Sequence, residues 1–158
     1  MYRDKIFDID YNNTKTSKLI SLDIKTTKTC NLSCRICSPL YSSKWASEVS
    51  NNKKSYPQFS LLPIVKNEWT EINGSKVWKD LEEITSDLSY ITFLGGEPLL
   101  DKTHSSMLQY FINKQKSIHM SLHYNTNATI FASNLIPLWS CFKEVELSFS
   151  IDNTGKKF

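Results

Sequence analysis

The spacing of hydrophobic residues changes repeatedly along the chain. Four short stretches are rich in β-branched and aromatic residues and predict strands over 19–24, 90–94, 118–124 and 145–151. Between them, apolar residues recur every three or four positions and predict helices over 41–49, from Ser75, from near Lys102 and over 134–139. The polar run 50–57 lacks this period and predicts a surface loop. A repeated strand-then-helix order is typical of an α/β fold around a parallel sheet.

A distinctive segment follows each of the four predicted strands directly. These segments are the cysteine-containing loop 30–37, the Gly-Gly-Glu-Pro run 95–98, the Asn-Thr-Asn run 125–127 and the Ser-Ile-Asp run 150–152. In parallel strand–helix folds the functional loops lie at the carboxyl ends of the strands. We therefore expect all four segments to face one shared cleft.

Three of the four cysteines, Cys30, Cys34 and Cys37, lie within one short loop. A tight, odd-numbered group argues against disulfides and indicates a metal site in a reducing compartment, so we expect a cytoplasmic protein. Three thiolates from irregular backbone suit three corners of an iron-sulfur cubane. The fourth iron would then be open to a small molecule, which makes the cluster a reaction centre rather than an electron carrier.

Two other interpretations of the cysteine loop remain open. A zinc site would add Cys141 or one of His104, His119 and His123 to the three thiolates, although zinc sites usually use pairs of closely spaced ligands. An electron-transfer cluster would need a fourth cysteine close by. Cys141 lies far along the chain, in a segment that reads as core, and we expect it to be a buried apolar residue.

The other strand-end segments carry residues suited to ligand binding. Gly95 and Gly96 lack Cβ atoms and allow close approach of the backbone to a ligand, Glu97 adds an acceptor, and Pro98 fixes the chain direction. Polar groups for ligand binding follow the next two strands; they are Asn125, Thr126, Asn127, Ser150 and Asp152. Each of these could equally be a simple turn former. Lys44 and Arg35 could neutralise a carboxylate, or could simply be solvated.

Composition narrows the class of protein. A chain of 158 residues with 40% hydrophobic and 12% aromatic residues is enough for one globular unit. The net charge of +3 comes mostly from scattered lysines, and only two arginines are present, so we expect no nucleic-acid partner. No segment is apolar and long enough to predict a membrane span.

The motif Cys30-Asn31-Leu32-Ser33-Cys34-Arg35-Ile36-Cys37, followed by Gly95-Gly96-Glu97-Pro98, resembles the radical S-adenosylmethionine superfamily. The pairing of the two motifs is much more specific than either alone. The resemblance extends from about Leu19 onward, and runs 43–45 and 99–100 look most like the subgroup with SPASM or twitch domains. It implies a full or partial parallel strand–helix barrel of the TIM type.

The resemblance also implies a role for each motif residue. Cys30, Cys34 and Cys37 would ligate a [4Fe-4S] cluster whose free iron binds S-adenosylmethionine. The Gly95–Pro98 turn would receive the cofactor's ammonium group, and Ile36 would pack near its adenine. The turn 125–127 would bond its ribose or carboxylate. Reduction of the cluster, by an external donor such as a flavodoxin or ferredoxin, would give a 5′-deoxyadenosyl radical that abstracts hydrogen from a substrate, in this subgroup a peptide or protein.

The resemblance bears on domain organisation as well. Residues 1–158 would be the amino-terminal part of a radical S-adenosylmethionine core domain, preceded by an extension over 1–18 and truncated after about four strand–helix units. We expect two more such units downstream. The competing interpretations are a non-catalytic iron-sulfur module and a zinc-binding module.

Overall fold

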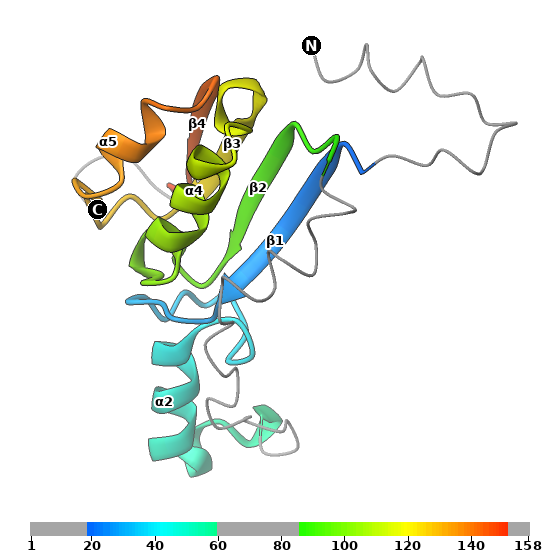
Figure 1. Cartoon of the computed structure of the whole chain (residues 1–158). Helices are drawn as coiled ribbons and strands as arrows, with labels where there is room; N and C mark the ends of the chain where they lie inside the picture. Colours follow the sequence, from blue (N-terminus) through cyan, green and yellow to red (C-terminus); the bar gives the residue numbers. More distant parts are fainter. Residues whose placement is uncertain (1–18, 60–85, 152–158) are drawn as a thin grey trace, which may run out of the picture.

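The computed structural model describes residues 19–59 and 86–151, which form a parallel α/β fold (Figure 1). Its sheet contains β1 (Ser21–Thr27), β2 (Tyr90–Gly95), β3 (Ser121–Thr126) and β4 (Glu144–Phe149). The strands lie in the order β1-β2-β3-β4 and every neighbouring pair is parallel. The α/β class and the parallel sheet predicted from the sequence are confirmed.

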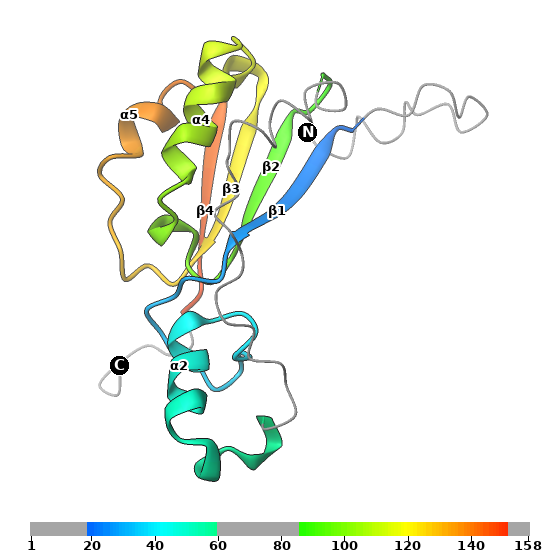
Figure 2. The ribbon, with the colours of Figure 1, turned by 60° about the horizontal axis from the view of Figure 1, so that its bottom comes forward.

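Helices and short 3-10 turns connect the strands. The helices are α2 (Ser43–Asn51), α4 (His104–Asn113) and α5 (Ile136–Trp139). The 3-10 turns are Lys53–Ser55, Pro57–Phe59, Pro98–Leu100 and Ser117–His119. Figures 1 and 2 show α4 and α5 on the same face of the sheet. The helix expected from Ser75 and the extension 1–18 lie outside the described residues.

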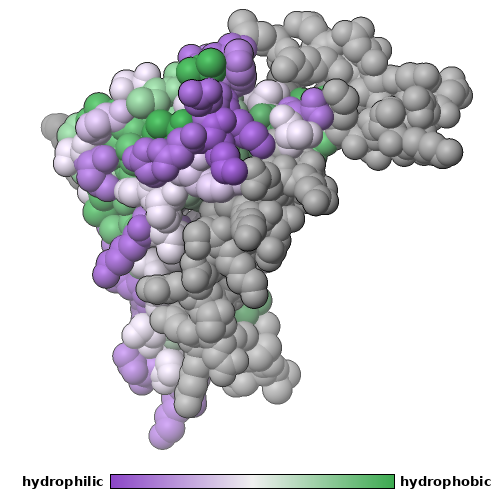
Figure 3. Space-filling view, in the orientation of Figure 1, coloured by the Kyte–Doolittle hydropathy of each residue, from purple (hydrophilic) through white to green (hydrophobic). Residues whose placement is uncertain are grey.

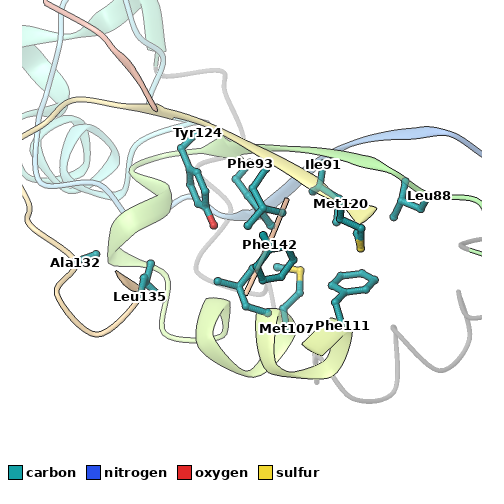
Figure 4. Close-up of a cluster of buried hydrophobic side chains, with 12 residues drawn as sticks. Leu88, Ile91, Phe93, Met107, Phe111, Met120, Tyr124, Ala132, Leu135 and Phe142 are labelled. Carbon is teal, nitrogen blue, oxygen red and sulfur yellow. The ribbon is translucent and has the colours of Figure 1, made fainter. Parts of the chain in front are cut away.

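The hydrophobic core lies between that face of the sheet and the two helices (Figure 4). Ile91, Phe93 and Tyr124 point from the strands toward Met107 and Phe111 of α4, and all five are buried. Strand residues two apart share a face, while helix residues three or four apart share a stripe, so the observed spacing brings these side chains together. The sequence pattern thus accounts for the packing of this layer.

The opposite face of the sheet is polar. Residues paired in parallel register share a face, so Asp23, Thr92, His123 and Glu146 form one row across all four strands. The row nearer the carboxyl ends contains Lys25, Leu94, Asn125 and Ser148. α4 and α5 lie on the apolar face.

α2 does not cover the sheet. It lies beyond the carboxyl ends of the strands, next to the cysteine loop (Figures 1 and 2). The visible surface around it is mainly hydrophilic or neutral (Figure 3). Within the described part of the chain, no helix combines the length and the apolar character needed to cross a membrane.

Several element boundaries differ from the sequence predictions. The run 50–57 is not a plain loop, because α2 continues to Asn51 and two 3-10 turns follow it. These turns bring Tyr56 and Phe59 edge-on to Trp45, with ring centroids 5.1 and 5.8 Å apart, and this aromatic packing orders a polar sequence. Similarly, Ser117–His119 forms a 3-10 turn, so β3 begins later than expected.

Candidate functional site

The amino-terminal end of α2 holds the cysteine loop at the end of β1. Ser42 is the N-cap of α2: its hydroxyl accepts a hydrogen bond from the Trp45 amide at 3.2 Å and donates one to the Leu32 carbonyl at 2.7 Å. The Trp45 indole donates to the Cys37 carbonyl at 3.0 Å. These bonds satisfy backbone groups on both sides of Cys34, so α2 and the loop form one folded unit.

None of the three clustered cysteines forms a disulfide, and each is half-buried. The Cys30 amide donates to the Ser43 hydroxyl at 3.1 Å, and the Leu32 amide lies 3.5 Å from the Cys30 sulfur. Backbone N–H groups directed at a thiolate stabilise its charge and tune the potential of a cluster that it holds. Free, partly exposed thiols on an irregular, hydrogen-bonded loop form a donor set of the kind a cluster needs.

The geometry of the loop differs from a site for one ion. Among residues 19–59 and 86–151, no three Cys, His, Asp or Glu side chains converge closely enough to hold a single metal ion. Cys141 is exposed at the end of α5, so the expectation that it is buried is wrong. The short helix ends at Trp139 and leaves Cys141 in a turn at the surface.

Gly95 and Gly96 approach the chain's own backbone. A Cβ atom on Gly95 would lie 2.5 Å from the Thr27 carbonyl oxygen, and Gly95 has a φ of 140°. A Cβ on Gly96 would lie 2.6 Å from the Lys28 carbonyl oxygen and closer still to that of Thr29. The Gly96 amide donates to the Thr27 carbonyl at 3.1 Å. Glycine is therefore required here because the turn after β2 packs directly on the segment that leads into the cysteine loop.

Glu97 is fully buried and joins the ends of two strands. One carboxylate oxygen accepts hydrogen bonds from the Thr126 hydroxyl at 2.7 Å and the Leu99 amide at 3.2 Å. The other oxygen accepts from the Asn127 amide at 2.7 Å. Pro98, also buried, begins the 3-10 turn that follows. Since a carboxylate has about four acceptor positions, one position on the second oxygen remains for a further donor.

The turn after β3 also contacts the cysteine loop. The Asn127 side-chain amide donates to the Asn31 side-chain oxygen at 3.0 Å, and the Asn31 amide donates to the Thr129 hydroxyl at 2.7 Å. The Thr129 hydroxyl donates in turn to the Asn127 side-chain oxygen at 2.6 Å. Between them, Ala128 has a φ of 58°, in the region that favours glycine. Cys30–Cys37, Gly95–Pro98 and Thr126–Asn127 are thus joined into one hydrogen-bonded site.

A lysine that sequence reasoning did not single out lies at this site. The Lys25 ammonium is 3.7 Å from the centroid of the Tyr41 ring, and its stem passes 3.6 Å from the position of a Cβ on Gly95. Burial lowers the pKa of Lys25, while the nearby Cys37 thiolate opposes this shift. The signal in the sequence was a lysine on the polar face of β1, just before the cysteine loop.

The remaining predicted site residues lie on the surface. Ile36 is 87% exposed at the tip of the cysteine loop, and Arg35 beside it is exposed as well. Asn125 and Ser150 are exposed at the ends of β3 and β4. The Ser150 amide donates to the Thr126 carbonyl at 2.8 Å, which ties the end of β4 to the site, whereas Asp152 lies outside the described residues.

None of the three histidines lies on the cysteine loop, and one of them is buried in the core. His104 Nε2 lies 3.1 Å from the Tyr124 hydroxyl, which also accepts from the Trp139 indole at 3.0 Å. The Tyr124 hydroxyl thus forms hydrogen bonds with both side chains inside the core. Burial lowers the pKa of His104 to about 4 and raises that of Tyr124. His119 is exposed.

Comparison of the chain with protein-family models, curated proteins and solved structures found no match. The chemistry of the site therefore has to be argued from its own residues. Three free thiols, a buried carboxylate and a partly buried ammonium group meet at the carboxyl edge of the sheet.

Proposed function

We propose that this chain is the cluster- and cofactor-binding part of a radical S-adenosylmethionine enzyme of the SPASM or twitch type, with a partial TIM-barrel core. The observation that carries the proposal is the joining of three strand ends into one site. A loop with three free thiols follows β1, and hydrogen bonds connect it to the Gly-Gly-Glu-Pro turn after β2 and the Asn-Thr-Asn turn after β3. Cys30, Cys34 and Cys37 would hold the [4Fe-4S] cluster.

The donor set suits this cluster better than a single ion. Three thiolates occupy three corners of a cubane and leave one iron for an exchangeable ligand. When bound, the cluster and S-adenosylmethionine supply a 5′-deoxyadenosyl radical by one-electron reductive cleavage of the cofactor's sulfonium. The electron would come from an external protein such as a flavodoxin or ferredoxin.

The surrounding residues would bind and orient the cofactor. The Glu97 carboxylate accepts three hydrogen bonds and would offer its fourth acceptor position to the cofactor's ammonium group. Lys25 adds a positive charge beside Cys37, which would favour a reduced, more negative cluster. Ile36 is exposed in the structure, so the tip of the cysteine loop would have to move before this side chain could pack on an adenine ring.

The polar face of the sheet supports a polar substrate such as a peptide. His123 Nε2 lies 2.9 Å from the Ser148 hydroxyl, and exposed Asn125 lies on the same face, nearer the carboxyl ends. Such groups bond amides and hydroxyls along an extended chain, whereas an apolar face would favour a lipid. The substrate would reach the radical from this side because the helices cover the other.

Anaerobic reconstitution of the full chain with iron and sulfide tests the proposal. We expect about four irons per chain, the absorption of a [4Fe-4S] cluster, and an electron paramagnetic resonance signal that changes when S-adenosylmethionine is added. Cys34→Ala should abolish these signals. The exposed fourth cysteine provides a matched control, so Cys141→Ala should retain them.

The outcomes separate the competing interpretations. Formation of 5′-deoxyadenosine after reduction supports catalysis by the chain itself. A cluster whose electron paramagnetic resonance spectrum does not change when S-adenosylmethionine is added would indicate a non-catalytic iron-sulfur module. Tight uptake of zinc with no iron chromophore would contradict the proposal.

A further inference from the structure

We propose that Asn31, Asn127 and Thr129 form a latch that fixes the shape of the cysteine loop, and that they are positioning residues for its ligand. Only one part of this inference rests on the proposed function, namely that the ligand is an iron-sulfur cluster. The latch itself follows from three hydrogen bonds, two of which join segments almost a hundred residues apart.

The three bonds form a closed ring. Asn31 donates to Thr129 at 2.7 Å, Thr129 donates to Asn127 at 2.6 Å, and Asn127 donates back to Asn31 at 3.0 Å. Each side chain donates one bond and accepts at least one, so every dipole points the same way around the ring. Hydrogen bonds in such chains polarise and strengthen one another. Loss of any member breaks the cycle.

Both ends of the latch are anchored to rigid parts of the fold. On one side, Glu97 accepts from the Asn127 amide at 2.7 Å and from the Thr126 hydroxyl at 2.7 Å, and its carboxylate is completely buried. On the other, the Lys44 ammonium of α2 donates to the Asn31 carbonyl at 2.9 Å. The ring therefore connects the sheet, through Glu97, to the loop between Cys30 and Cys34.

The latch should affect the loop much more than global stability. Its bonds lie at an exposed or half-buried edge, where an individual bond adds little to the cooperative core. Segments held by few such bonds open locally, without global unfolding. Consequently the latch controls how often the cysteine loop opens locally from the conformation seen in the structure. Residues that act in this way position a ligand's donor groups and add little to global stability.

Hydrogen exchange of the metal-free chain tests the latch without cluster or cofactor. We expect Asn31→Ala and Thr129→Val to speed amide exchange over 28–37 by ~3- to 10-fold, as expected for loss of one or two such bonds. Exchange in β2 and β3 should not change. Thr129→Ser keeps the hydroxyl and should behave like the parent, and Ser133→Ala, an exposed site later in the same stretch of chain, is a further control.

The double variant Asn31→Ala/Thr129→Val separates one latch from two independent contacts. If the ring acts as a unit, the double variant exchanges no faster over 28–37 than Asn31→Ala alone. Additive effects, or unchanged exchange in the single variants, would overturn the latch. Exchange that rises equally in β2 and β3 would show a general structural role and would also overturn it.

Iron uptake connects the latch to its ligand. After reconstitution, the single variants should hold less iron per chain than the parent, and Thr129→Ser should restore the parent value. Full iron content in variants with fast-exchanging loops would overturn the positioning role. If the parent chain takes up no iron, the proposed function fails, while the exchange experiment still decides whether the latch fixes the loop.

Discussion

Gly96 has no side chain, which allows the turn after β2 to pack against the backbone that follows β1. A Cβ there would lie 2.6 Å from the Lys28 carbonyl oxygen, and backbone cannot move aside as a flexible side chain can. We expect Gly96→Ala to lower the free energy of unfolding by about 1–3 kcal/mol, as overpacking does. Urea unfolding measures this, with Ser133→Ala as a surface control. An alanine variant as stable as the parent would contradict the packing described.

His104 should make stability depend on pH. Its pKa is about 4 in the folded chain and 6.5 when unfolded, so the unfolded state binds more protons between these values. The contribution of neutral His104 to the free energy of unfolding is fully present above pH 6.5 and is lost as the pH falls toward 4. The 2.5-unit difference corresponds to roughly 3 kcal/mol.

His104→Gln should therefore flatten the decline of unfolding free energy between pH 6.5 and 4, measured by urea titration at each pH. The exposed His119 provides the matched control, and His119→Gln should leave the slope unchanged. Equal slopes in the parent and the His104 variant would show that His104 is not held neutral by burial.

Residue types and spacing made part of the site predictable, and tertiary contacts determined the rest. Cys30, Cys34 and Cys37 stand out because they are close in sequence. By contrast, Asn31 meets its partner Thr129 across 98 residues, and nothing in the local sequence of either indicates the other. Gly96 stands out in the Gly-Gly-Glu-Pro run, but the group it approaches in the structure is the chain's own backbone, which only the register of β1 and β2 determines.

At the scale of elements, periodicity predicted the four strands and α2, α4 and α5, but not how α2 packs. α2 follows β1 in the chain, as a crossover helix would, yet it lies beyond the sheet because Ser42 and Trp45 bind it to the cysteine loop. Sequence periodicity predicts that a helix has an apolar stripe, but it does not predict which surface of the protein that stripe packs against. The three buried residues of α2 are Trp45, Ala46 and Val49.

The cap of α2 should stabilise both the helix and the loop. Ser42→Ala removes the acceptor for the Trp45 amide and the donor to the Leu32 carbonyl, so we expect a loss of about 1–2 kcal/mol in unfolding free energy. Ser47→Ala is the matched control because Ser47 is exposed within the same helix, where alanine is favourable. Equal stability of the two variants would show that the cap contributes nothing.

Among the described residues, α4 and α5 pack on the apolar face of the sheet, whereas the opposite face is polar and the cysteine loop follows its carboxyl edge. Lys25 lies where that face meets that edge. Removing its charge should lower the midpoint potential of a bound cluster by tens of millivolts, because the reduced cluster is the more negative state. Lys25→Gln tests this by redox titration, and Lys25→Arg, which keeps the charge, should stay near the parent value. A potential that does not change, or rises, in Lys25→Gln would exclude this electrostatic role.

The most direct measurement of the central claim is the Mössbauer spectrum of the chain reconstituted with ⁵⁷Fe, recorded with and without S-adenosylmethionine. Three thiolates leave one iron of the cubane chemically distinct, and that iron alone should change its isomer shift when the cofactor binds. We expect three unchanged sites and one shifted site. Two results would contradict the proposal that this loop holds a cluster with an open iron. One is a spectrum of four equivalent irons that does not change with S-adenosylmethionine, and the other is a spectrum without the signals of a cubane.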